Sequence, residues 1–142
     1  KSFQVMIGLK LCLWVMLGGA LGAVSRYLMT HFFDQYLVKT PLSVGMLVCN
    51  IAGCFLFGWV SAWLTTIKTQ DASEASLAFL TAFLISGFLA SFTTFSSWIG
   101  EGDKFGNIEF LSLLKMGGYF MLSIVLGLSF LYLGSKCYLW FK

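Results

Sequence analysis

The sequence predicts an all-α integral membrane protein with four transmembrane helices. Three observations lead to this prediction. Of the 142 residues, 58% are hydrophobic and only 11% are charged, and the mean hydropathy is +0.87. Soluble domains carry about 25% charged residues, so a soluble globular domain is excluded. The chain also contains four apolar runs of about 22–25 residues, each long enough to cross a hydrocarbon core of about 30 Å.

The four runs are expected to cross the membrane in turn, as a single membrane domain over residues 1–142. They cover roughly Leu11–Phe32, Leu42–Thr66, Leu77–Ile99 and Leu111–Tyr132. The first run is too long for a removable signal peptide, so we expect it to remain as a span. The connections are too short to hold a soluble domain. Because four thin helices scarcely enclose a path, we expect the chain to oligomerise.

The basic residues are divided almost evenly between the two sides of this topology. One side holds Lys1, Lys10, Lys68, Lys136 and Lys142, and the other holds Arg26, Lys39, Lys104 and Lys115. An excess of Lys and Arg normally marks the cytoplasmic side. Two interpretations stay open: other factors set the orientation, or copies insert both ways and pair antiparallel.

The titratable residues argue against an enzyme. The four cysteines have no metal-ligand spacing, and no nucleophile–base pair or phosphate loop is present. Membrane enzymes need titratable groups in or near the bilayer, as do small proton-coupled exporters. The acids instead fall in the predicted linkers or at span ends: Asp34, Asp71, Glu74, Glu101, Asp103 and Glu109. Passive permeation is therefore favoured over a small four-helix multidrug-type exporter, which stays as the alternative from another class.

Gly87–Trp98 is the most informative segment, because it places hydroxyl residues between aromatic rings inside an uncharged apolar run. In hydrocarbon every backbone N–H and C=O needs a partner. A polar or interrupted helix therefore survives only where protein or a water-lined path surrounds it. The segment is predicted to be a conduction or binding site.

Other spans carry polar residues that have simpler explanations when each is taken singly. Asn50, near the middle of the second run, could form an interhelical hydrogen bond worth about 0.6–2 kcal/mol. Arg26 could be an interfacial cation or an anion-attracting charge. Tyr119 and Ser123 are four residues apart and share a helix face. Together they place polar groups on several spans.

Three motifs in order resemble the Fluc (CrcB-type) fluoride channel family. They are Gly-Gly-x-x-Gly-Ala-x-x-Arg-Tyr at Gly18–Tyr27, Gly-x-Leu-x-x-Asn-x-x-Gly-x-Phe-x-x-Gly at Gly45–Gly58, and Thr-Thr-Phe-Ser at Thr93–Ser96. The resemblance covers the chain from Gly18 to about Tyr132. It implies an antiparallel dual-topology dimer with a broken third helix, two fluoride pores and a structural Na⁺ at the centre. The balanced basic residues agree with such a dimer.

The resemblance also assigns roles to individual residues. Asn50 resembles the pore amide that coordinates fluoride, and Phe95 resembles the first ring of a phenylalanine box whose electropositive edges face the anion. The second ring of the box is Trp98 here. Hydroxyl donors along the path would be Ser96, Ser97, Tyr119 and Ser123.

Charged and cation-binding positions follow from the same resemblance. Arg26 resembles the vestibule arginine of the family, and Glu101 resembles its acidic residue after the box. The central Na⁺ would be held by the backbone carbonyls of Ala90 and Thr93, at the break in the third helix. The implied partners are fluoride, sodium, membrane lipid and a second copy or homologous subunit, with no nucleic acid. The implied role is passive export of cytoplasmic fluoride across the plasma (inner) membrane.

Four positions depart from the family pattern. Trp98 replaces a Phe, Ala90-Ser91 replaces a Gly-Gly, Met46 replaces a Thr, and Gly127 replaces a small hydroxyl residue. Trp98 keeps an aromatic edge but is larger. These departures leave open a second possibility, in which the chain is a non-conducting or half-conducting subunit of a heteromeric fluoride channel.

Overall fold

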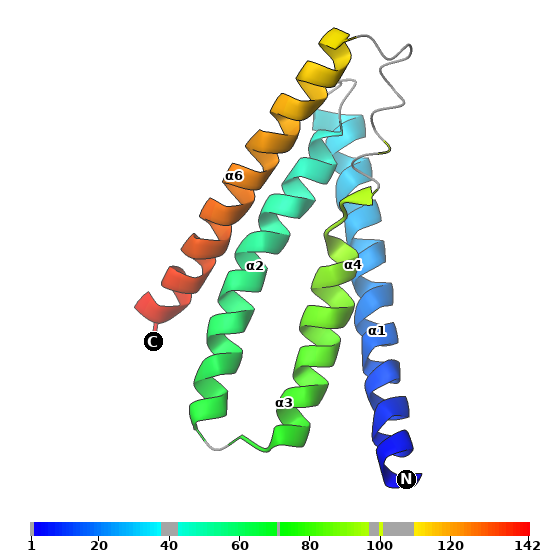
Figure 1. Ribbon diagram of the computed structural model, residues 1–142, viewed down its shortest axis with the longest axis vertical. Coiled ribbons are helices and arrows are strands. Elements are labelled where there is room, and N and C mark those ends of the chain that lie inside the picture. The colour runs from blue at the N-terminus through cyan, green and yellow to red at the C-terminus, as the bar shows by residue number, and fades with distance from the viewer. Residues whose placement is uncertain (1, 38–42, 71, 97–99, 101–109) are drawn as a thin grey trace.

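The computed structural model describes residues 2–37, 43–70, 72–96, 100 and 110–142, and this part of the chain is helical in all its elements (Figure 1). Within these residues, four helices are long and apolar enough to cross a membrane. They cover Met6–Tyr36, Val44–Thr69, Glu74–Phe92 and Gly117–Trp140. The prediction of an all-α, multi-pass membrane protein is confirmed.

The elements follow one another along the chain. They are α1 (Ser2–Phe32), the π-helix η1 (Phe33–Leu37), α2 (Val44–Thr69), α3 (Glu74–Thr81), the π-helix η2 (Ala82–Leu89), α4 (Ala90–Phe92) and α6 (Phe110–Trp140).

Element boundaries differ from the predicted runs at several places, including the first helix, where α1 begins at Ser2 rather than Leu11. Asp34 was expected in a linker, but it lies in η1, so helical structure continues past the first acidic residue. The fourth helix runs to Trp140 rather than Tyr132, because the residues around Lys136 remain compatible with a helix. Among the described residues, the third helix ends at Phe92, and Thr93 is extended with φ −86° and ψ 150°.

Two helices begin with a serine cap. The Ser43 side chain accepts a hydrogen bond from the Met46 N–H at the start of α2, and the Ser73 side chain accepts one from the Ser76 N–H at the start of α3. Such caps satisfy amide groups that have no partner within the helix. Glu74 lies in the first turn of α3, where a negative charge is favourable.

The helices run alternately up and down and form two close pairs (Figure 1). One pair is α2 with α6, and the other is α1 with η2 and α4; contacts between the two pairs are sparser. Both chain ends lie in the lower half of the view, the half that holds the connection from α2 to α3. A gap lined by side chains remains between the pairs, and the candidate site lies there.

Glycines form the seam between α1 and η2. A Cβ at Gly18 would meet the backbone oxygen of Phe83, and a Cβ at Gly22 would meet that of Phe88. From the other side, a Cβ at Gly87 would lie 2.8 Å from the backbone oxygen of Val15. Small residues allow helix backbones to approach closely in membranes. The Gly18/Gly22 spacing therefore serves helix packing.

Glycines also form the seam between α2 and α6. A Cβ at Gly58 would meet the Leu131 carbonyl oxygen, and a Cβ at Gly134 would meet the carbonyl oxygen of Phe55. The Ser135 hydroxyl donates to the Gly58 carbonyl at 3.3 Å, across the same seam. This pair is held by backbone contact as much as by side chains.

Gly134→Ala is expected to lower the melting temperature of the purified protein. The added methyl meets backbone, which cannot rotate away, and overpacking of this kind costs about 1–3 kcal/mol. Gly118→Ala is the matched control on the same helix, because a Cβ there meets nothing within 4 Å. It is expected to leave the melting temperature unchanged or raise it, since Ala is the better helix former. Equal melting temperatures for the two variants would contradict the close backbone packing of α2 and α6 at Gly134.

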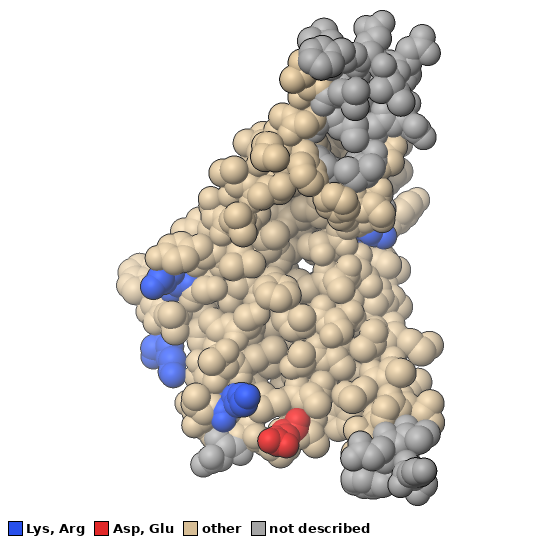
Figure 2. Space-filling view, in the orientation of Figure 1, with Lys and Arg blue, Asp and Glu red and all other residues tan. Residues whose placement is uncertain are grey.

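The described part of the chain buries few side chains. The buried hydrophobic residues are Met46, Cys49, Ala82, Leu89 and Phe92. Many large apolar side chains are exposed along the helices. The middle of the face in Figure 2 is largely free of charge, and the charged groups that it shows lie along its edges and toward its lower end. Contact between such an apolar surface and water is unfavourable. The exposed faces are therefore suited to lipid or to another membrane helix.

Candidate functional site

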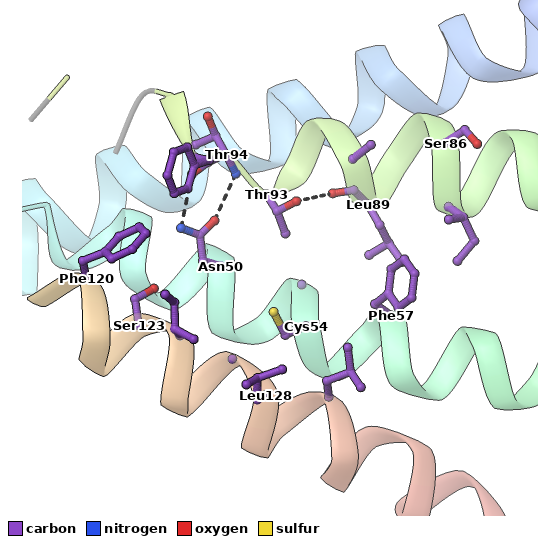
Figure 3. Close-up of a pocket in the computed structure, with 17 residues that line it drawn as sticks. Asn50, Cys54, Phe57, Ser86, Leu89, Thr93, Thr94, Phe120, Ser123 and Leu128 are labelled. Atoms are coloured by element: carbon purple, nitrogen blue, oxygen red, sulfur yellow. Dashed lines mark hydrogen bonds between the residues drawn. The ribbon is translucent and has the colours of Figure 1, made fainter. Parts of the chain in front are cut away.

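A cavity of about 840 Å³ lies between the two helix pairs (Figure 3). We call it the central cleft. α2, the third helix and α6 all contribute side chains to it. Its lining is mostly apolar and holds polar groups at Asn50, Ser86, Thr93, Thr94 and Ser123. No charged side chain is among its described lining residues.

Asn50 joins α2 to the segment that follows α4. Its Nδ2 donates to the Thr94 carbonyl oxygen at 3.3 Å, and its Oδ1 accepts from the Thr94 N–H at 3.0 Å (Figure 3). An asparagine amide has two N–H donors and one carbonyl acceptor, so it can pair with both polar groups of one backbone residue. Asn50 supplies hydrogen bonds that a continuing helix would have supplied to Thr94.

Thr93 forms the turn where the helix ends. Its backbone N–H and its Oγ1 both donate to the Leu89 carbonyl oxygen, at 3.0 and 2.9 Å. Ala90 is still helical, so the turn begins later than the full Ala90–Thr93 range expected from the sequence. The absence of a side chain at Gly53 makes room for the turn, since a Cβ there would meet Cγ2 of Thr93.

Two aromatic rings meet at the cleft. The rings of Phe95 and Phe120 have centroids 5.4 Å apart and planes inclined at 71°, an edge-to-face arrangement. Both residues line the cleft, and Phe95 is 63% exposed. The rim of an aromatic ring carries partial positive charge and its face partial negative charge. The cleft therefore offers ring edges as well as hydrogen-bond donors.

The face of α6 that lines the cleft has helical spacing. It consists of Phe120, Ser123, Ile124, Gly127, Leu128 and Leu131. Ser123 is thus in the cleft together with Asn50. The hydroxyl of Tyr119 is directed elsewhere: it donates to the Ser43 carbonyl oxygen at 3.0 Å.

The structure brings together five of the residues predicted to form the site. Asn50, Ala90, Thr93, Phe95 and Ser123 all line the cleft.

The remaining predicted residues lie apart or cannot be placed. Arg26 is on α1, where its carbonyl oxygen lies 4.0 Å from Sγ of Cys49, and Ser96 is exposed just beyond the turn. Neither is among the residues that line the cleft. Ser97, Trp98 and Glu101 lie outside the described residues.

Among the cleft residues that sequence reasoning did not assign to the site, two make specific contacts there. Phe120 was not singled out, although it adjoins Tyr119 in an apolar span and its ring meets Phe95. Thr94 was noted only as a member of a motif, but its backbone is what Asn50 binds. The π-helical geometry of η2 was also not predicted; π-helical turns are rare and often occur near functional sites. No periodicity in the sequence signals it.

The fold and the cleft define a class: a multi-pass membrane protein with a mostly apolar site between its helices, which holds a few polar groups and no charge among the lining residues that the structure describes. A family model described as "CrcB-like protein, Camphor Resistance (CrcB)" matches residues 13–135, and the chain belongs to this family. The family membership confirms the predicted resemblance.

Relatives from several bacteria carry one name, "Fluoride-specific ion channel FluC". The protein from Francisella tularensis subsp. mediasiatica is 35% identical over 130 residues, which is 87% of this chain and 91% of the relative. Those from Hydrogenobaculum sp. and Flavobacterium psychrophilum are 36% and 37% identical, each over 84% of this chain and 90% of the relative. The family is one of ion channels, so the prediction that the chain is not an enzyme is confirmed.

Proposed function

We propose that this protein is a passive channel for fluoride. The observation that carries the proposal is the central cleft, where an amide, hydroxyls and ring edges converge with no fixed charge in the described lining. The name shared by the relatives points to the same ion. The expected direction is export of fluoride from the cytoplasm across the plasma (inner) membrane.

The proposed mechanism replaces the water around fluoride with donors of the protein. Fluoride is small and strongly hydrated, and conduction needs sites that bind it well enough to enter but weakly enough to leave. Pairing with Thr94 uses one N–H of the Asn50 amide, and the second is assigned to the anion. Ser123 and the edges of Phe95 and Phe120 continue the path. A cation at the narrowest point would hold the anion too tightly.

The proposed assembly is an antiparallel, dual-topology dimer with two pores. The small buried core and the long exposed apolar faces of the described helices support a further membrane partner. A closed twofold pairing is the commonest way to cover such faces. The nearly even division of basic residues supports copies that insert in both directions.

A structural Na⁺ is proposed at the turn after α4. The helix ends at Phe92, so its last carbonyls, Ala90 among them, face the turn at the negative end of the helix dipole. Carbonyl oxygens suit a hard cation. Thr93 is extended there, and both it and Ala90 line the cleft. Adding NaCl in place of N-methylglucamine chloride should raise the melting temperature if this site holds the ion.

The heteromeric alternative has one favourable observation in the cleft. At position 127, where the family pattern has a small hydroxyl residue, this chain has Gly, so α6 offers no hydroxyl to this part of the wall. A Cβ at Gly127 would lie 3.2 Å from the Sγ of Cys54. Arg26 and Glu101 as vestibule residues, and Ser96, Ser97, Trp98 and Tyr119 as pore residues, stay predictions.

The proposed function is tested by fluoride efflux from liposomes that hold the purified protein. A fluoride electrode should record rapid release after the membrane potential is collapsed with an ionophore, and chloride-loaded liposomes should release little. If this chain alone gave no fluoride efflux and a homologous subunit restored it, the heteromeric channel would be favoured. Uptake of cationic drugs driven by a proton gradient, without fluoride flux, would favour the exporter.

Phe95→Ile is expected to reduce fluoride efflux strongly while the protein stays assembled. Ile fills much of the space but has no electropositive edge, and it loses the edge-to-face contact with Phe120, worth about 0.5–1.5 kcal/mol. Leu128→Ile is the control, because Leu128 lines the same cleft through an aliphatic side chain. Efflux is measured from liposomes and assembly by size-exclusion chromatography. Equal efflux from the two variants would contradict the role of Phe95 in the ion pathway.

A further inference from the structure

Asp34, Ser43 and Tyr119 form a chain of hydrogen bonds that joins three helices. Asp34 lies in η1, where its Oδ1 accepts from the Gly45 N–H at 2.8 Å and its Oδ2 accepts from the Ser43 hydroxyl. Ser43 is the cap of α2 and is only 4% exposed. Its carbonyl oxygen accepts from the Tyr119 hydroxyl of α6 at 3.0 Å.

The carboxylate of Asp34 holds the start of α2 in place. Its two oxygens each take one donor from the first residues of that helix. Hydrogen bonds to a charged acceptor are about twice as strong as neutral ones. A negative charge is also favourable at a helix N-terminus. The position of Ser43 is therefore set from η1 as well as from within α2.

The position of Tyr119 depends in turn on Ser43. A backbone carbonyl can only accept, so Tyr119 is the donor in this hydrogen bond and uses its single hydroxyl hydrogen for it. Tyr119 directly precedes Phe120, whose ring meets Phe95 in the central cleft. Holding the tyrosine fixes the rotation of the first part of α6, and with it the place of that ring.

We propose that Asp34 is a positioning residue for the ion pathway, acting through Ser43 and Tyr119 on the Phe120 end of the central cleft. The inference rests on the proposed function and adds a residue to it. Asp34 does not itself line the cleft. It lines a separate cavity of about 380 Å³ with Tyr27, Thr30, His31 and Gln35. Its effect on an ion in the cleft is therefore transmitted through hydrogen bonds.

The experiment compares Asp34→Ala with Asp34→Asn in the efflux assay. Asn keeps an oxygen for the Gly45 N–H and offers an N–H to the Ser43 hydroxyl, so its efflux should stay within about twofold of the parent. Ala removes both contacts and should lower efflux about tenfold. If Asp34 instead acted by its negative charge, both variants would remove that charge, and both would raise anion efflux to the same extent. That result would overturn the proposal. Glu74→Ala, an acid in the first turn of α3, is the control.

A double-variant comparison tests the route through Tyr119. Tyr119→Phe alone should lower efflux, because the link to Ser43 is lost. Asp34→Ala should then add less than about a twofold loss in the Tyr119→Phe background. The same tenfold loss in both backgrounds would show that Asp34 acts by another route and would overturn the proposal.

A structural readout keeps the inference separate from the proposed function. 4-Fluorophenylalanine at position 120 reports the surroundings of that ring by fluorine NMR. Its resonance should move in Asp34→Ala and stay in Asp34→Asn. A parent protein without fluoride efflux would refute the proposed function, while the NMR comparison would still test the positioning. An unmoved resonance in Asp34→Ala would overturn the positioning even where efflux is intact.

Discussion

Asn50→Ala is expected to abolish fluoride efflux, with a loss of at least about a hundredfold. The change removes the proposed donor to the anion and also leaves the N–H and the carbonyl of Thr94 without the partner that they have in the structure. Each buried polar group left unpaired costs about 1–3 kcal/mol, and about 1.4 kcal/mol corresponds to a factor of ten. The two losses act on the same turn, so the turn should change its conformation.

Two further variants separate the roles of Asn50. Asn50→Asp keeps an acceptor for the Thr94 N–H but loses the donor and adds a negative charge beside the path, so it should also block an anion. Cys54→Ala, one turn further along α2 in the same cleft, should leave efflux near that of the parent. Liposome efflux is measured for all three, and size-exclusion chromatography checks assembly. Parental efflux from Asn50→Ala would contradict both the pore role and the turn-holding role.

Gly53→Ala is expected to reduce efflux and lower the melting temperature. The new methyl would occupy the place of Cγ2 of Thr93 and come within 3.4 Å of Cδ1 of Phe92. Thr93 would have to rotate, which breaks the hydrogen bond from its Oγ1 to the Leu89 carbonyl. Overpacking of this kind costs about 1–3 kcal/mol. Against this, Ala in place of Gly favours the helix by about 1 kcal/mol, so the effect on efflux should exceed the effect on stability.

A second change should rescue this variant. Thr93→Ser removes the methyl that the new side chain would meet but keeps the hydroxyl that donates to Leu89. The double variant should recover efflux, whereas Thr93→Ser combined with Gly117→Ala should behave like Thr93→Ser alone, because a Cβ at Gly117 meets nothing within 4 Å. Efflux and thermal unfolding are measured side by side. Failure of the rescue would mean that Gly53 matters for a reason other than its contact with Thr93.

Much of the fold could be predicted because apolar length is a strong signal in membranes. A run of about 20 apolar residues indicates a membrane span by itself, without knowledge of what it packs against. The ends of the helices were harder. Asp34 lies in η1, and its carboxylate binds the start of α2, a contact between residues that composition does not connect. The π-helix η2 lies where α1 approaches closely at Gly18 and Gly22, a contact that a single run of residues does not reveal.

The candidate site was only partly predictable. The motif pointed to Asn50 and Phe95, and the structure places both in one cleft. Their roles toward an ion stay predictions. Thr94 could not be identified by residue type, because Asn50 binds its backbone and every residue has one. The orientation of Tyr119 was hidden for a similar reason, since its acceptor is the backbone carbonyl of Ser43.

The two glycine seams have a consequence for the biogenesis of the protein. Each seam joins helices that are separated by another span: α1 packs on η2, and α2 packs on α6. As the chain leaves the ribosome, N-terminal parts become available first. The first helix therefore lies in the bilayer without its seam contact until the third is inserted, and the second helix lacks its own until the fourth is inserted. The α1–η2 seam can form once the third helix has been inserted, but the α2–α6 seam requires the last helix, so a chain halted before α6 would leave α2 without its partner.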